Sequence, residues 1–199
     1  MKVDEWLSFF KQYKHKKLFS IADLSQLTGE NKSSLAVQLT RLVKAGLVKR
    51  IAYGWYENPF MPPSHEEIAM ILRYPSYLSM EYALSKQGIL SQAVYTLTLI
   101  TTKLPYTYKT EGATYEYHQI NKNLFWGYKR AGMVQIAEAE KALLDLIYIR
   151  YAKNRGLDTT GLKSLLNDMD IGEFDFKKLH MYSKKFSPKT RKILTSLKI

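Results

Sequence analysis

The residues best suited to chemistry in this sequence lie on the outer face of one predicted helix, over residues 32–45. Hydroxyl, amide and guanidinium groups are the side-chain groups that hydrogen-bond to phosphates and base edges in the DNA major groove. The amide of Gln38 suits adenine, and the guanidinium of Arg41 suits guanine or a phosphate. The predicted contacts on this helix are Ser33, Ser34, Val37, Gln38, Arg41 and Lys44.

A second set of groups follows on a predicted β-hairpin. Strands over 47–52 and 55–57 flank a turn at Tyr53 and Gly54, and both strands are rich in β-branched and aromatic residues. Lys49, Arg50 and Tyr53 are placed to reach the DNA backbone or the neighbouring minor groove.

Capping residues define the elements that must hold these groups in place. An amphipathic helix is predicted over 3–13. Ser20 is predicted to begin a short helix that ends at Gly29, and Asn31 to begin the longer helix, which ends at Gly46. The apolar stripe that turns the longer helix inward consists of Leu35, Leu39, Leu42 and Val43.

This order of elements resembles the winged helix-turn-helix of transcription factors, and the resemblance implies DNA binding. Two other interpretations stay open at this stage. The basic side chains would also suit a solvated surface, and some winged helices serve only as protein-docking modules.

Charge is unevenly distributed along the 199 residues, whose formal net charge is +12. Residues 1–62 carry +5, residues 63–152 carry +1 and residues 153–199 carry +6. Such an excess attracts nucleic acid first and an anionic membrane second. Because 46% of the residues are hydrophobic, a disordered basic tail is excluded.

Other classes of protein are excluded by what the sequence lacks. It has no cysteine, which excludes disulfides, thiol nucleophiles and cysteine-based zinc sites. It has neither a run of about 18 apolar residues nor a hydrophobic signal core, so we expect a soluble, cytoplasmic protein.

A proline-rich segment over 58–63 is the predicted domain boundary, because proline continues neither a helix nor a central strand. We expect an α+β protein with a DNA-binding domain over 1–62 and a mixed α/β domain over 63–199. The second domain is predicted to contain a small sheet and C-terminal helices. Its predicted helices cover 64–73, 79–87 and 137–153, its strands 94–101, 114–120, 124–128 and 133–136, and three short helices follow residue 157.

The second domain shows no established catalytic motif. It lacks a phosphate-binding loop, a G-x-S-x-G elbow and an H-E-x-x-H pair. None of the histidines (His15, His65, His118 and His180) has a second ligand at metal spacing, so no metal, cofactor or catalytic residue is expected.

Four charged residues keep an enzyme acting on nucleic acid or nucleotides open as a third possibility. They are Glu138, Glu140, Lys141 and Asp145. The first three are predicted to be a helix cap and solvated charges. Asp145 lies among leucines and is expected to need a buried partner.

Three segments of the second domain are similar to the AbiEi antitoxin family: 77–89, 96–102 and 134–146. The family pattern has a Ser-x-x-x-Ala-Leu-x-x-x-Gly helix, a threonine-rich strand and an Ala-x-x-Glu-Lys-Ala-Leu-x-Asp-Leu helix. The matching residues are Ser79, Ala83, Leu84, Gly88, Ala137, Glu140, Lys141, Ala142, Leu143, Asp145 and Leu146.

The resemblance implies an antitoxin of a type IV toxin–antitoxin phage-defence system. Such antitoxins repress their own operon at inverted repeats in double-stranded DNA. They counteract a nucleotidyltransferase-like toxin without a stable complex. Because symmetric half-sites need two copies, we expect a monomer or weak dimer that pairs on DNA, and no membrane partner. The alternative is an effector-sensing regulator whose second domain binds a small ligand.

The basic C-terminal helices are a second candidate surface, on charge alone. They would contact a polyanion or take part in neutralising the toxin, or they form a solvated face. The residues are Lys177, Lys178, Lys184, Lys185, Lys189, Arg191 and Lys192.

Overall fold

The structure is a computed structural model that describes residues 1–110, 112–152 and 160–197. Aromatic side chains at helical spacing form its first hydrophobic core. Trp6, Phe9 and Phe10 are buried on one helix, where Trp6 packs on the two phenylalanines. The rings of Phe9 and Phe10 in turn pack against Phe19, with centroids 5.8 and 5.5 Å apart. The chain divides into two compact units, Met1–Leu72 (unit 1) and Arg73–Ile199 (unit 2). The division therefore falls after Leu72, whereas the sequence predicts a boundary at the proline-rich segment.

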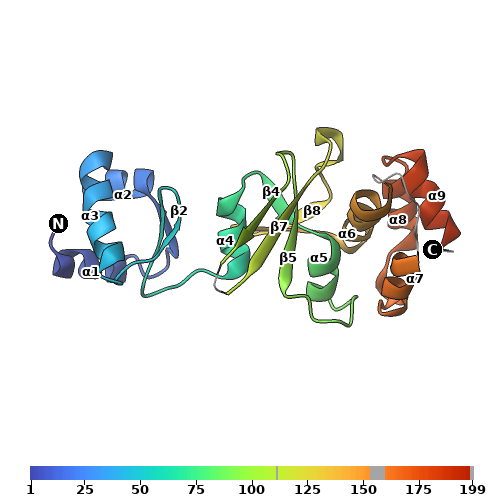
Figure 1. Ribbon diagram of the computed structural model, residues 1–199, viewed down its shortest axis with the longest axis horizontal. Helices are drawn as coiled ribbons and strands as arrows, with labels where there is room; N and C mark the ends of the chain where they lie inside the picture. The colour runs from blue at the N-terminus through green and yellow to red at the C-terminus, as the bar shows by residue number, and fades with distance from the viewer. Residues whose placement is uncertain (111, 153–159, 198–199) are drawn as a thin grey trace. The chain divides into compact units, whose positions relative to one another are not determined.

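Unit 1 combines helices with a three-stranded antiparallel sheet of order β1-β3-β2. Figure 1 shows its helices α1, α2 and α3 beside the β2 hairpin. Leu35, Leu39 and Leu42 of α3 are buried in the core with Leu24 of α2, as the apolar stripe predicts. The elements are α1 (Val3–Gln12), β1 (Leu18–Ser20), α2 (Ile21–Thr28), α3 (Lys32–Lys44), β2 (Arg50–Ala52), β3 (Trp55–Glu57) and α4 (His65–Leu72).

Unit 2 contains a six-stranded mixed sheet of order β6-β7-β5-β4-β9-β8. β5 runs parallel to β7, and β4 runs parallel to β9, while the other neighbours are antiparallel. The strands are β4 (Ser76–Leu78), β5 (Thr96–Thr101), β6 (Tyr106–Lys109), β7 (Thr114–Gln119), β8 (Tyr128–Ala131) and β9 (Val134–Ala137).

Helices cover the sheet of unit 2 in two layers. Figure 1 shows α5 and α6 next to the sheet, and α7, α8 and α9 beyond α6. One buried core joins α5, α6 and the C-terminal helices. The helices are α5 (Met80–Lys86), α6 (Ala139–Leu146), α7 (Thr160–Asn167), α8 (Phe176–Ser183) and α9 (Pro188–Ser196), with short turns η1 (Lys122–Leu124), η2 (Ile147–Ala152, a π-helix) and η3 (Ile171–Glu173).

Several predicted elements differ from the observed ones. The strand predicted over 124–128 is wrong: Lys122–Leu124 form a 3₁₀ turn, and β8 begins only at Tyr128. Phe125 of this aromatic run packs against the ring of Tyr77, at 5.0 Å between centroids, instead of pairing in the sheet. The strand predicted over 47–52 is reduced to β2, and the helix predicted over 137–153 becomes α6 followed by η2, with residue 153 outside the described residues.

The α+β class is confirmed, with N-terminal helices around a small sheet and then a mixed sheet with C-terminal helices. The predicted capping residues of α2 and α3 are also confirmed, as described below. No helix in the described ranges is long and apolar enough to cross a bilayer.

Candidate nucleic-acid interface

The helical pair α2–α3 is fixed at its ends by side-chain caps. The Ser20 hydroxyl accepts a hydrogen bond from the backbone N–H of Asp23, whose carboxylate accepts one from the N–H of Ser20, both at 3.0 Å. Gly29 ends α2 with φ of +74°, a conformation that glycine adopts without steric cost. Asn31 begins α3 by accepting a hydrogen bond from the N–H of Ser34 at 2.8 Å.

The hairpin is anchored to the helices through one buried amide. The side chain of Asn58 is fully buried, and its nitrogen lies 3.0–3.1 Å from the carbonyl oxygens of Phe10, Tyr13 and Lys16. Asn58 directly follows β3, so these contacts attach the base of the hairpin to the end of α1 and the loop after it. The hairpin therefore keeps a defined position relative to α1.

The outer face of α3 is only partly free. Ser33, Arg41 and Lys44 are exposed, and Val37 has 55% of its surface exposed. Arg41 and Lys44 lie in the last turn, where cations interact favourably with the helix dipole. This part of α3 matches the outward positions predicted from the sequence.

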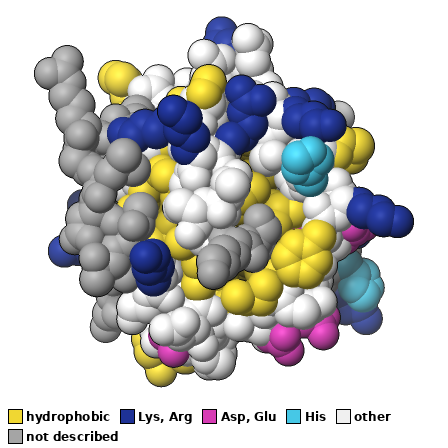
Figure 2. Space-filling view, turned by 90° about the vertical axis from the view of Figure 1, so that its right-hand side faces the viewer, with side chains coloured by type: hydrophobic (Ala, Val, Ile, Leu, Met, Phe, Trp, Pro, Cys, Tyr) yellow, Lys and Arg dark blue, Asp and Glu magenta, His cyan; other side chains and the backbone are white. Residues whose placement is uncertain are grey.

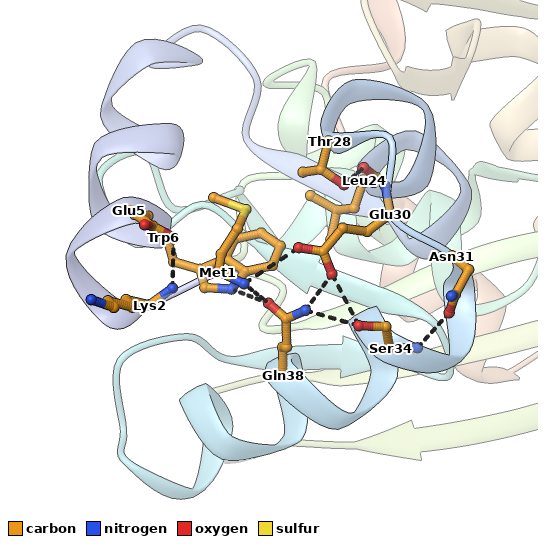
Figure 3. A network of polar contacts seen from close by, with 10 residues as sticks. All are labelled: Met1, Lys2, Glu5, Trp6, Leu24, Thr28, Glu30, Asn31, Ser34 and Gln38. Atoms are coloured by element: carbon orange, nitrogen blue, oxygen red, sulfur yellow. Dashed lines mark hydrogen bonds and ion pairs between the residues drawn. The ribbon is translucent and has the colours of Figure 1, made fainter.

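Gln38 and Ser34 are engaged within the protein instead (Figure 3). The Glu30 carboxylate accepts hydrogen bonds from the Ser34 hydroxyl, at 3.0 Å, and from the Gln38 amide nitrogen. The Gln38 amide oxygen accepts hydrogen bonds from the indole N–H of Trp6, at 3.0 Å, and from the amino group of Met1, at 2.8 Å. Both polar atoms of the amide that the sequence assigns to base reading are thus occupied.

The same network explains the charge state of Glu30. The hydrogen bond from Ser34 is the largest of the causes that lower the pKa of this carboxyl, so Glu30 is ionised at neutral pH. Glu30 precedes the first turn of α3 and pairs with the amino group of Met1 at 3.3 Å, while Arg41 and Lys44 lie in the last turn of the helix. The electrostatics of this helix favour a polyanion at the Arg41–Lys44 end.

The hairpin carries the remaining predicted contacts on its exposed surface. Lys49 and Arg50 are exposed, and the turn places Tyr53 with 93% of its surface exposed. The Arg50 guanidinium lies 5.2 Å from the centre of the Tyr53 ring and donates to the carbonyl of Ala52 at 3.3 Å. Gly54 has φ of +71° and allows the tight turn that presents this pair.

Lys49 lies near an acidic residue: burial raises the pKa of Glu57, and the charge of Lys49 opposes this shift. Within the described part of unit 1, the ion pairs of Asp23 and Glu67 are with Lys16 and Lys17. Arg41, Lys44, Lys49 and Arg50 form no ion pair within the described ranges. We call these four exposed cations, on the end of α3 and the adjoining hairpin, the basic edge.

The basic residues predicted to act on the C-terminal helices differ in their exposure. Lys177, Lys184, Lys185, Arg191 and Lys192 are exposed on or between α8 and α9. Lys189 is half-buried and has a partner. Figure 2 shows Lys and Arg side chains gathered along one edge of this face, next to a band of hydrophobic side chains.

Lys178 belongs to an internal ion-pair cluster. Its ammonium lies 3.0 Å from the Glu140 carboxylate and 3.3 Å from that of Glu138. Burial alone would lower the pKa of Lys178, and the two carboxylates raise it above the ordinary value. Lys185 lies over the ring of Trp126, at 4.3 Å from its centre.

The charged residues that left an enzyme possible do not converge on one open site. Lys141 and Asp145 are fully buried and pair with each other, while Glu138 and Glu140 face Lys178. The prediction that Glu140 and Lys141 are solvated is wrong, because α6 is covered by the C-terminal helices. Among the described residues, no group of three His, Asp or Glu side chains lies close enough to hold a metal ion.

Asp145 has the buried partners that its position among leucines predicts. Its carboxylate accepts hydrogen bonds from the hydroxyls of Tyr77, at 2.9 Å, and Ser79, at 2.8 Å, and the Lys141 ammonium also donates to the Tyr77 hydroxyl, at 2.8 Å. Burial raises the pKa of Asp145 and lowers that of Lys141, while each partner opposes the shift of the other. Sequence reasoning missed Tyr77 and Ser79, which lie more than 60 residues away.

A glycine makes room for this buried pair. Gly127 has φ of +77°, and a Cβ atom there would lie 2.9 Å from Cγ of Lys141. The same ammonium lies 5.2 Å from the ring centres of Trp126 and Phe186. The pair therefore ties β4, the start of α5, α6 and the C-terminal helices into one core.

No protein-family model matches the chain, and no curated protein sequence matches it.

Proposed function

We propose that residues 3–57 form a winged helix-turn-helix that binds double-stranded DNA. The observation that carries the proposal is the basic edge, where the exposed cations Arg41, Lys44, Lys49 and Arg50 occupy a helix end and the adjoining hairpin. Ser33, Val37 and Tyr53 are close to these cations in the sequence. They are also exposed, and they complete the proposed contacts. Phosphates are the ligands that such a surface attracts most strongly.

Gln38 and Ser34 have a positioning role in this proposal. Their hydrogen bonds with Glu30 and Trp6 hold the start of α3 against α1, so they act on DNA through the helix they orient. We expect Gln38→Ala to lower the free energy of unfolding by about 1–2 kcal/mol, because it leaves the buried indole N–H of Trp6 without this acceptor and removes a hydrogen bond to the half-buried Glu30. Affinity for DNA should fall by no more than about threefold, well short of the loss from removing a phosphate contact. Urea denaturation measures the stability, and gel-shift titration measures the affinity for DNA. An affinity loss well above threefold would mean that Gln38 contacts the DNA directly.

The biological role that we propose is autorepression in the cytoplasm. It rests on the similarity of residues 77–89, 96–102 and 134–146 to the AbiEi antitoxins, together with the order of elements in unit 1. The operator would be an inverted repeat in the chain's own promoter, bound by two copies that pair on the DNA.

A reporter gene behind the DNA upstream of this chain's own coding region tests repression. Expression of the full chain should lower reporter output, and the Arg41→Gln/Lys49→Gln variant should restore it. A reporter that is unaffected by the wild-type chain would remove autorepression from the account.

The second role in the proposal is antitoxicity of unit 2, without catalysis. The exposed residues Lys177, Lys184, Lys185, Arg191 and Lys192 are the proposed contributors, because from 176 onward the sequence has no acidic residue. Co-expression of the full chain with a nucleotidyltransferase-like toxin encoded next to it should restore growth. Glutamine at Lys184, Arg191 and Lys192 should reduce the rescue, and full rescue by this variant would exclude the basic face.

A further inference from the structure

The sheet of unit 2 ends on one side at β6, and this strand is open to solvent. Among the described strands, β6 pairs with β7 alone. Tyr106, Thr107 and Lys109 are exposed, and so is the nearby Leu104. The outer side of an edge strand presents unpaired backbone N–H and C=O groups, which are a template for pairing with another strand.

The register with β7 shows which backbone groups of β6 face outward. At the end of this hairpin, the N–H of Thr110 donates to the carbonyl of Ala113 at 2.9 Å, which makes the two residues a hydrogen-bonded pair. Such pairs alternate along an antiparallel ladder, so Thr107 and Lys109 point their N–H and C=O groups away from β7. Within the described ranges these outward groups have no partner.

An antiparallel copy of β6 matches these groups in one register. Thr107 then lies opposite Lys109 of the second copy, and the outward groups of both residues form inter-strand hydrogen bonds. The same register places Tyr108 directly opposite Tyr108 of the copy. Tyr108 packs on Tyr106, at 4.5 Å between ring centroids, so aromatic side chains of both copies meet on one face of the joined sheet.

The other edge of the sheet, β8, does not suit a copy of itself. The N–H of Glu138 donates to the carbonyl of Gly127 at 2.9 Å, so the same alternation leaves the backbone groups of Tyr128 and Arg130 facing outward. Pairing these groups with those of a copy would place Lys129 directly opposite Lys129. Like charges in this position destabilise a sheet, and charged side chains protect edge strands from pairing.

We propose that two copies of this chain associate through β6, with a two-fold axis at Tyr108. Residues 63–152 carry a net charge of only +1, so two copies repel each other less here than at the C-terminal helices. Leu104 and Tyr106, with 71% and 53% of their surfaces exposed, supply apolar surface beside the axis. Because the contact is one short strand, we expect a weak dimer, with a Kd on the order of 100 μM.

This pairing deepens the proposed function, on which it rests for its biological role. Two joined chains carry two copies of unit 1 for the two half-sites of an inverted repeat. Both experiments below are done without DNA. Failure of the dimer therefore leaves DNA binding by unit 1 intact, and failure of DNA binding leaves the dimer intact.

A single cysteine tests the register, because the chain has no cysteine of its own. Residues opposite each other in a non-hydrogen-bonded pair have Cα atoms about 4.5 Å apart, which a disulfide can span. Tyr108→Cys in the full chain should therefore form a disulfide-linked dimer with oxidised glutathione. In the control Thr107→Cys, the cysteine lies opposite Lys109 instead of its own copy, so crosslinking should be at least about tenfold slower. Equal rates for the two variants would contradict the pairing.

Sedimentation equilibrium of the full chain at physiological salt measures the dimer itself. Thr107→Lys should raise the Kd by about tenfold, because it places like charges opposite each other at two symmetric positions. Adding Lys109→Glu should reverse this loss, since opposite charges then face each other. The control Asn167→Lys adds the same charge at an exposed position on α7 and should leave the Kd unchanged.

Two results of this measurement would overturn the proposal. A wild-type chain that stays monomeric at about 1 mM would leave the β6 edge to a strand of another protein. A Thr107→Lys variant that dimerises as strongly as the wild-type chain would place the contact on another surface.

Discussion

Replacement of Arg41 and Lys49 with glutamine is expected to weaken binding to promoter DNA by about 10- to 100-fold near physiological salt. Both side chains belong to the basic edge, and neither forms an ion pair in the described structure. Each phosphate contact releases condensed counterions, so the slope of log K against log salt should flatten by about 2 when two contacts are lost. Gel-shift titrations at several salt concentrations measure both the affinity and the slope.

A control for net charge separates this surface from general attraction to a cationic protein. Lys103→Gln/Lys122→Gln removes the same charge from exposed positions in unit 2. This variant should keep the wild-type slope, apart from a small long-range effect that salt screens. If the two double variants behave alike, the basic edge is not the surface that binds DNA.

Replacement of Asp145 with alanine is expected to cost unit 2 about 3–5 kcal/mol of stability at pH 7. The change leaves the Lys141 ammonium fully buried, without its carboxylate and with only the Tyr77 hydroxyl as a hydrogen-bond acceptor. An uncompensated buried charge is among the most destabilising features that a single substitution creates. Urea denaturation followed at the amide signals of α6 measures the loss.

The double variant Lys141→Met/Asp145→Leu shows whether the stability lost in Asp145→Ala comes from the unpaired charge or from lost packing. Replacing both members of a buried pair with apolar side chains of similar volume is often close to neutral. We therefore expect the double variant to recover most of the stability lost in Asp145→Ala. Equal losses in the two variants would mean that hydrogen bonds to Tyr77 and Ser79, rather than the ion pair, hold this core together.

Local signals in the sequence predict much of unit 1, because its helix ends depend on nearby residues. Ser20, Gly29 and Asn31 act within four residues of their partners, and their residue types are sufficient to place the ends of α2 and α3. The buried leucine stripe of α3 likewise follows from the period of the helix. The positions of Arg41 and Lys44 on the exposed side follow in turn.

Short strands and distant partners could not be predicted in this way. β1, β4 and β6, of three or four residues each, lie outside the predicted strands. β4 is buried throughout and depends on pairing with β5 and β9. The aromatic residues over 124–128 have high strand propensity, but packing on Tyr77 overrides it.

The side chains of the candidate sites also divide into those whose surroundings follow from nearby residues and those whose partners are distant in the sequence. The exposure of the basic edge follows from the sequence pattern, whereas the occupation of Gln38 depends on Trp6, 32 residues away. Arg150 pairs with Glu81 and Glu116 only when the sheet and the π-helical turn are in place. Sequence reasoning had no signal for this arrangement.

Binding of the full chain to its own upstream DNA, measured against a scrambled duplex of equal length and composition, tests the central claim most directly. We predict that the upstream duplex is bound at least about 1,000-fold more tightly at physiological salt. A footprint should cover two half-sites whose centres are separated by about one helical turn or a multiple of it. Equal affinity for the two duplexes, without a footprint, would contradict specific DNA recognition by unit 1.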